Sequence, residues 1–238
     1  MDIGERFELP GGAFASFTGR AQGNLSSVGG DAAERGLAAR ERLRQTLGVR
    51  ALLRGYQVHG STVGRVLANG ERPGLPGALD GKDSTRQPPL EADGHAVAAP
   101  GMAAMVLTAD CIPVVLACEG AAAALHAGWR GLAAGVLDEG VRALREVGGR
   151  GEIAAVVGPC AGACCYEVGE EVHAAFAGAD RDGRLIDLRA IAHETLLAAG
   201  VAQVADLDAC TICDERFFSH RREGPRAGRQ AGIAWVAR

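Results

Sequence analysis

Apolar residues along the chain fall mainly into short continuous runs, each bounded by glycine, proline or charged residues. Runs of roughly four to eight apolar residues with such boundaries are typical of buried β-strands. They predict strands over residues 13–18, 51–58, 62–67, 103–108, 121–125, 153–157 and 233–236. Strands therefore recur from one end of the chain to the other.

A helical pattern near the N-terminus begins with a polar start signal. Asp31 is followed three residues later by Glu34, as in a capping box. Leu37 and Leu47 mark the apolar stripe of this helix, and Gly48 fits the position of a C-cap. The pattern predicts that the helix begins at Asp31 and ends at Gly48.

Three further helices are predicted in the second half of the chain. Within residues 132–147, Leu137, Val141 and Leu144 follow the i, i+4, i+7 spacing of one helix face. The other two helices cover residues 168–176 and 188–199.

Strands and helices mix along the whole length, and no linker separates them. The pattern therefore predicts the α/β (α+β) class, with one layered domain over residues 1–238, mixed β-sheets and outer helices. Residues 69–89 are rich in glycine, proline and charge and show no periodicity. This segment is long for a connection within a domain, so we expect a flap or a partly disordered loop.

The composition is that of an ordinary globular protein, with 47% hydrophobic and 23% charged residues among 238. The net charge of −4 and the lack of a basic stripe argue against nucleic-acid binding. No apolar run approaches the roughly 18 residues of a membrane span, and residues 1–10 lack a signal-peptide pattern. Seven cysteines, an odd number, argue against a closed disulfide framework. We expect a cytoplasmic, monomeric protein with mostly reduced thiols.

Three polar residues stand where predicted strands end: His59, Cys111 and His126. Functional groups of α/β folds collect at strand ends, because the loops there converge. One thiolate and two imidazoles form a sensible set of three ligands for a catalytic Zn²⁺. Each residue also has an ordinary structural interpretation, since cysteine is among the most buried residue types.

Two segments offer positive charge for an anion. Residues 126–131 form a glycine-bracketed turn before a predicted helix, and Arg130 stands beside the free N–H groups of that helix start. Arg221 lies in a basic cluster near the C-terminus, and arginine suits bidentate phosphate binding. The alternative is that both arginines are simply solvated.

The remaining cysteines carry weaker signals. Cys210 and Cys213 form a C-x-x-C pair, which is half of a zinc site, a redox motif or two structural thiols. The last interpretation is favoured, because no second C-x-x-C follows at a suitable spacing. Cys164 and Cys165 are adjacent and cannot easily face one site from a strand, so we expect them to be structural.

Several motifs together resemble one known family. In chain order they are QVHG (57–60), EADG (91–94), TADCIP (108–113), HAGWRG (126–131), GPC (158–160), YEV (166–168), FSHRR (218–222) and GR (228–229). The set resembles the laccase-domain family, once described as polyphenol oxidases. Its members are now described as purine nucleoside phosphorylases and, in bacteria, as the peptidoglycan editing factor.

The resemblance implies a layered α/β fold related to the cytotoxic-necrotizing-factor deamidases. It also implies a zinc site on His59, Cys111 and His126, with copper as a further candidate metal. Asp110, next to the cysteine ligand, is the implied acid/base or orienting residue. Arg20 resembles the family's arginine before a glycine-rich loop, although Ala21-Gln22-Gly23 replaces the usual pair of glycines.

The function implied by the resemblance is phosphorolysis of adenosine, inosine and methylthioadenosine, together with deamination of adenosine. Phosphate and purine nucleosides are the implied partners, with Arg20, Arg130 and Arg221 as candidate phosphate-binding residues. Three other functions remain open. They are a copper polyphenol oxidase (laccase), a hydrolase that edits peptidoglycan precursors with Cys111 as nucleophile and His126 as base, and a binding module with a structural metal. The first is disfavoured because six histidines are few for several copper ions.

Overall fold

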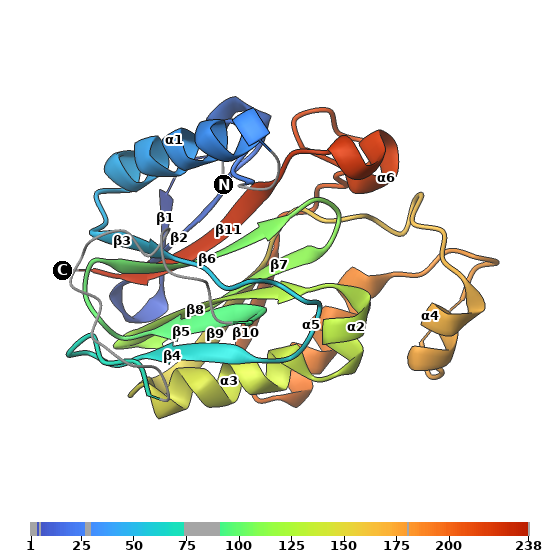
Figure 1. The fold of residues 1–238 in the computed structure, drawn as a ribbon. Coiled ribbons are helices and arrows are strands. Elements are labelled where there is room, and N and C mark those ends of the chain that lie inside the picture. Colours follow the sequence, from blue (N-terminus) through green and yellow to red (C-terminus); the bar gives the residue numbers. More distant parts are fainter. Residues whose placement is uncertain (1–3, 5, 27–29, 74–90, 180, 238) are drawn as a thin grey trace.

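A computed structural model of the chain describes all residues except 1–3, 5, 27–29, 74–90, 180 and 238. Two β-sheets lie face to face, and helices cover their outer faces, so that the layers run helix, sheet, sheet, helix (Figure 1). The predicted layered α/β class with mixed sheets is confirmed. Most of the predicted flap at 69–89 lies outside the described residues.

The first sheet has five strands, and its C-terminal strand lies at the centre. Its spatial order is β1 (Arg6–Leu9), β2 (Ala13–Phe17), β11 (Gln230–Val236), β6 (Met102–Thr108) and β3 (Ala51–Leu53). All neighbours are antiparallel except β3 and β6, which are parallel. The two ends of the chain thus pair within one sheet.

The second sheet has six strands and is also mixed. Its order is β10 (Gln203–Asp206), β9 (Arg150–Val157), β7 (Ile112–Glu119), β8 (Ala121–Ala127), β5 (Gly94–Val97) and β4 (Val63–Val66). The outer pairs β9–β10 and β4–β5 are parallel, and the inner pairs are antiparallel.

Small side chains fill the space between the two sheets. Because side chains alternate along a strand, Ala122 and Ala124 of β8 face the first sheet, whereas Ala123 and Leu125 face the helices. The inter-sheet core also contains Phe17 as its largest fully buried side chain. His126 follows Ala124 on the inter-sheet face, at the end of β8.

Helices cover the two outer faces. They are α1 (Gly30–Leu47), α2 (Trp129–Ala133), α3 (Val136–Glu146), α4 (Glu170–Ala175), α5 (Leu188–Ala198) and α6 (His220–Glu223), with short 3₁₀ turns at Pro10–Gly12, Arg20–Gln22 and Gly224–Arg226. Helix α1 packs on the first sheet, and α3 and α5 pack on the second (Figure 1). No helix among the described residues has the length and apolarity needed to span a bilayer.

Several elements differ from the predictions for physical reasons. The strand expected over 51–58 ends at Leu53, because the chain leaves the sheet to form the loop of His59. The helix expected over 132–147 is interrupted at Gly135, whose φ of 83° is left-handed. Strand β7 was not predicted, although its apolar run from Val114 to Ala117 is fully buried.

The N-terminal helix also differs in detail. It begins at Gly30 rather than Asp31, and Leu37 is 41% exposed instead of lying on the apolar face. Gly48 does follow its end with a left-handed φ of 68°, and Leu47 is buried as predicted.

Candidate metal centre and active site

The structure brings His59, Cys111 and His126 together at one end of the sheet sandwich. Their ligand atoms lie within 4.8 Å of one another. The Sγ atom of Cys111 is 3.8 Å from Nε2 of His59, and the two imidazole rings meet edge to face with centroids 4.8 Å apart. His126 is buried, whereas His59 is exposed, so the group opens towards solvent on one side.

Two of the three residues lie where the chain crosses between the sheets. His59 stands between β3 of the first sheet and β4 of the second, and Cys111 stands between β6 and β7. His126 is on β8, beside β7. Both sheets must therefore be formed and packed before the three side chains meet.

Asp93 fixes the geometry of this group, and the sequence analysis gave it no role. Its carboxylate is buried and accepts the backbone N–H groups of Val58 (3.2 Å), His59 (3.0 Å) and Gly60 (2.7 Å). It also lies 2.7 Å from Nδ1 of His126, which leaves Nε2 for the metal. A carboxylate behind a histidine ligand is a common outer partner at metal sites. The EADG motif was the available signal for it.

A glycine provides the space between the three ligands. A Cβ atom on Gly128 would lie 2.8 Å from Cδ2 of His59 and 3.1 Å from Sγ of Cys111. The backbone of Gly128 has φ −67° and ψ 160°, which any residue can adopt. Glycine is therefore required here by space rather than by backbone conformation.

Electrostatics couple the thiol to the imidazoles. Burial raises the pKa of Cys111, but the adjacent His126 and His59 outweigh this and lower the pKa to about 6. Burial lowers the pKa of His126, but Cys111 and Asp93 raise it to about 9. Without a metal, the group therefore favours a Cys111 thiolate beside a protonated His126, and a metal that binds there would displace the proton from Nε2 of His126.

The donor set fits a metal ion. One thiolate and two imidazoles are soft and borderline ligands suited to Zn²⁺ or copper, and three protein ligands leave a coordination position open. The glycine gap at Gly128 and the carboxylate behind His126 are both expected of such a site.

Asp110 lies beside Cys111, but its carboxylate is already engaged. One oxygen accepts from Oγ1 of Thr211 (2.7 Å), and the other accepts from Oγ of Ser219 (3.1 Å) and the backbone N–H of Arg221 (2.7 Å). Its φ of 88° is rare outside glycine. These contacts favour an orienting role over acid/base work, because both oxygens have donors.

Tyr166 marks the side wall of the site. Burial raises the pKa of its phenol and nearby Cys111 adds to this effect, whereas Arg221 and Arg130 oppose it. The Arg221 guanidinium lies 5.1 Å from the centroid of the Tyr166 ring, and Nη1 donates to the carbonyl of Glu167. Arg221 therefore lies beside the site, since its backbone N–H also donates to Asp110, and Arg130 follows Gly128 by two residues.

Arg20 lies in a different environment. Its guanidinium pairs with Glu223, donates to the carbonyl of Phe217 (3.0 Å) and stacks 4.5 Å from the ring centroid of Phe218. Arg130 is exposed and rests 4.2 Å from the ring centroid of Trp129. Glu223 also pairs with Arg222 at 3.0 Å, so the two guanidiniums share one carboxylate.

Comparison with known proteins agrees with this architecture. The family model described as "multi-copper polyphenol oxidoreductase laccase" matches residues 11–237. The chain belongs to this family. The laccase-domain resemblance seen in the sequence motifs is therefore confirmed.

Curated relatives in the family carry a different functional name. A protein of Xylella fastidiosa (strain Temecula1) named purine nucleoside phosphorylase is 39% identical over 95% of this chain and 88% of its own length. A purine nucleoside phosphorylase of Streptomyces coelicolor is 36% identical over 98% of this chain and 99% of its own.

Solved structures of similar proteins share the fold. A Neisseria meningitidis protein superimposes with a TM-score of 0.79 at 28% identity, covering 98% of this chain and 99% of that one. YlmD from Geobacillus stearothermophilus gives a TM-score of 0.81 at 26% identity, covering 95% and 93%.

Proposed function

We propose that the chain is a zinc-dependent purine nucleoside phosphorylase acting on adenosine, inosine and methylthioadenosine, with adenosine deaminase activity. The observation that carries the proposal is the open group of His59, Cys111 and His126, next to Arg221, whose backbone N–H donates to Asp110. The names of the relatives from Xylella and Streptomyces support the same reaction class. We further propose a monomeric, cytoplasmic protein with a single catalytic domain.

The metal and the chain have separate tasks in this proposal. When bound, zinc supplies Lewis-acid chemistry and lowers the pKa of water to about 7, which suits attack on a purine ring. Asp93 holds the protonated Nδ1 of His126 and fixes the His59 loop through three backbone N–H groups. Asp110 orients the Arg221 segment by accepting its backbone N–H.

Phosphate would bind between Arg130 and Arg221. Arg221 lies against the ring of Tyr166 and Arg130 against the ring of Trp129, and both arginines are exposed. Arginine presents several donors in a planar fork that matches phosphate oxygens. Arg20 remains a candidate for substrate binding, but its pairing with Glu223 makes it the weaker choice for phosphate. The apolar faces of Trp129 and Tyr166 would line the purine slot.

The deciding experiment combines metal analysis with a product assay. The protein is purified without added metal, its zinc and copper are quantified, and it is incubated with adenosine with and without phosphate. We expect phosphate-dependent adenine and ribose 1-phosphate, and some inosine from deamination. Loss of both reactions on chelation and recovery with zinc would support the zinc assignment. Absence of all three products in zinc-loaded protein would contradict the proposal.

A matched pair of cysteine variants tests the ligand set. Cys111→Ala should remove the zinc held by this group and abolish activity, while Cys118→Ala should leave both unchanged because Cys118 is buried within β7. Retention of full turnover in Cys111→Ala would contradict the assignment.

The phosphate site is tested by a separate variant. Arg221→Ala should raise the phosphate concentration needed for half-maximal rate, and an unchanged phosphate dependence would move the anion site to Arg130 or Arg20.

One observation favours a second candidate function. Cys111, His126 and Asp93 form a nucleophile, a base and an orienting carboxylate, which is the arrangement of a thiol hydrolase. Such an enzyme would fit the editing of peptidoglycan precursors. A thiol hydrolase would stay active after chelation and lose activity on thiol alkylation. A zinc enzyme would lose activity after either treatment. A multi-copper oxidase lacks support, because the metal-ligand groups of the described residues contain only two histidines in total.

A further inference from the structure

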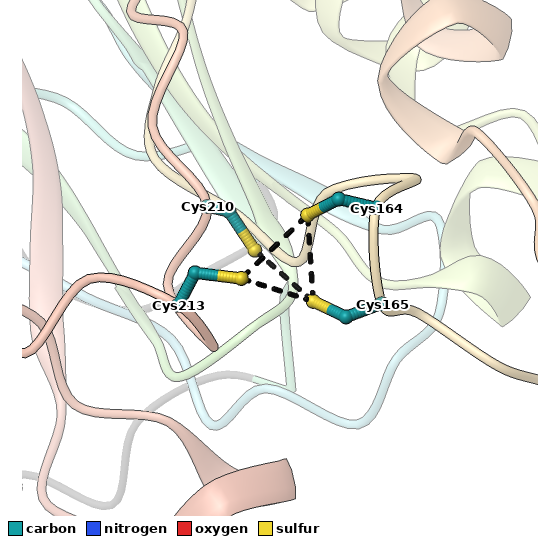
Figure 2. Close-up of side chains that lie close together, drawn as sticks. All are labelled: Cys164, Cys165, Cys210 and Cys213. Carbon is teal, nitrogen blue, oxygen red and sulfur yellow. Dashed lines mark hydrogen bonds between the residues drawn. The ribbon is translucent and has the colours of Figure 1, made fainter.

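Four cysteines outside the active site lie together in the structure. All four Sγ atoms of Cys164, Cys165, Cys210 and Cys213 are within 4.8 Å of one another. Figure 2 shows the four sulfurs pointing toward a common centre. From the sequence, adjacent Cys164 and Cys165 are not expected to face one site from a strand, but they do face one site here because they lie in a turn.

The fold explains why the two pairs meet. Strands β9 and β10 are parallel neighbours, and their pairing continues as an isolated bridge between Cys160 and Cys210. The loop after β9 then turns back at Gly162, whose carbonyl accepts the N–H groups of Cys165 and Tyr166. This turn brings two consecutive sulfurs towards the C-x-x-C loop that follows β10.

Backbone groups around Cys210 are arranged as donors to sulfur. The N–H of Gly162 lies 3.2 Å from Sγ of Cys210, and a Cβ on Gly162 would come within 3.3 Å of that sulfur. The backbone N–H groups of Cys213 and Ile212 also hydrogen-bond to the sulfur of Cys210. Hydrogen bonds of this kind stabilise thiolates that hold metals.

The sulfur spacing matches a tetrahedral site. Zn–S bonds of about 2.3 Å place ligand sulfurs about 3.8 Å apart in a tetrahedron. The separations from Cys165 are 3.5 Å to Cys164, 3.5 Å to Cys210 and 3.4 Å to Cys213, and Cys164 to Cys213 is 3.7 Å. The space between the sulfurs suits one ion.

We propose that Cys164, Cys165, Cys210 and Cys213 bind one zinc ion in a closed four-cysteine site. Four thiolates in tetrahedral array are typical of structural zinc, because they leave no position open for substrate. Arg222 holds the C-x-x-C loop in place, since its Nη1 donates to the carbonyls of Thr211 and Ile212 while its Nη2 pairs with Glu223.

Such an ion would fasten two loops that build the active-site wall. Cys165 directly precedes Tyr166, whose ring lies against Arg221. Cys210 and Cys213 flank the segment containing Thr211, whose hydroxyl donates to Asp110. The ion would therefore act as a structural cross-link behind the site, and its ligands would not touch substrate.

Metal stoichiometry in a Cys111→Ala background tests the proposal separately from the catalytic site. The protein is purified with a reductant and without added metal, and zinc is measured per chain. We expect about one zinc in Cys111→Ala and none after further change of Cys210→Ser and Cys213→Ser. Adding Cys118→Ala instead serves as the matched control and should leave that zinc in place.

A cobalt titration covers the case in which the triple variant does not fold. Cys111→Ala, stripped of metal and titrated with Co²⁺, should develop intense thiolate-to-cobalt charge-transfer absorption that saturates at one equivalent. Limited proteolysis of the stripped protein should cut near residues 161–166 or 209–214, and zinc should protect both loops. Iron in place of zinc, disulfides among these cysteines in reductant, or no cobalt absorption would each overturn the proposal.

Discussion

At the scale of single residues, Asp93 holds His126 and the loop of His59 in place without belonging to the group of His59, Cys111 and His126. It joins a strand end, a loop and a histidine through four polar contacts. An asparagine at this position would remove the negative charge and place its NH₂ group against one of the N–H groups that the carboxylate now accepts. We expect Asp93→Asn to weaken metal binding at this group by about 10–100-fold.

Chelator competition measures that change. The assay uses Cys210→Ser/Cys213→Ser protein, so that only the metal of the His59 group is counted. Asp206→Asn, an exposed residue on β10, is the control and should leave the affinity unchanged. Equal affinity in the two asparagine variants would remove Asp93 from the positioning role.

His95 provides a prediction about stability and pH. Its imidazole is buried in β5, and burial, with a contribution from Arg72, lowers its pKa to about 4. In the unfolded chain histidine titrates near 6.5, so between these values only the unfolded state takes up the proton. The free energy of unfolding should therefore fall, by up to about 3 kcal/mol, as pH drops from 7 to 4.

Urea unfolding of wild type and His95→Gln at several pH values isolates this effect. Groups that titrate in both proteins cancel in the difference between their unfolding free energies. As pH falls from 7 to 4, the free energy of unfolding of the wild type should decrease by about 3 kcal/mol more than that of His95→Gln. A difference that stays constant with pH would show that His95 does not titrate as expected.

At the scale of elements, the site is built where strands end and helix α2 begins. Both non-glycine residues with positive φ among the described residues lie here, His59 at 59° and Asp110 at 88°. Such backbone costs of order 1–3 kcal/mol and persists only where contacts hold it. Asp93 supplies those contacts for the His59 loop, and Ala161 donates its N–H to the carbonyl of Asp110.

A substitution at Gly128, which precedes α2, tests how closely the start of this helix packs on His59 and Cys111. Gly128→Ala should displace His59 and Cys111 and so strongly reduce metal occupancy of their group, because the new methyl would overlap both side chains. Gly178→Ala is the matched control, since a Cβ there meets nothing within 4 Å. Metal analysis and circular dichroism together check that occupancy falls while the fold remains. Full occupancy in Gly128→Ala would refute the steric argument.

At the scale of the whole molecule, the two sheets approach closely because alanines line their interface. Ala104, Ala117, Ala122, Ala124 and Ala234 are all fully buried there. A close approach is needed for His59 and Cys111, on crossings between sheets, to reach His126 on the second sheet.

A larger residue at this interface should destabilise the protein and disturb the site together. Ala124→Leu should lower the free energy of unfolding by about 1–3 kcal/mol through overpacking. Because Ala124 shares a face with His126, metal affinity should fall as well. Ala205→Leu, on an exposed position of β10, should change neither quantity. Denaturant unfolding and metal titration measure the two effects, and unchanged values for Ala124→Leu would contradict close sheet packing.

Local patterns in the sequence predicted much of this molecule. Continuous apolar runs located β2, β6, β8, β9 and β11, because full burial leaves a plain signal in composition. The TADCIP and HAGWRG motifs identified the family, and the resemblance to that family implied His59, Cys111 and His126 as a ligand set. These properties depend on short stretches of chain, so the sequence by itself determined them.

Only the tertiary structure decided which distant segments meet. No local pattern shows that β9 pairs in parallel with β10, yet this pairing brings Cys164 and Cys165 to Cys210 and Cys213. Likewise the EADG motif contains Asp93, but only the fold shows that its carboxylate contacts His126 and the loop of His59. The alternation of residues along a strand specifies which side chains are buried, but which strands pair with one another depends on the packing of two whole sheets. For that reason the residues around the ligands became visible only in the folded chain.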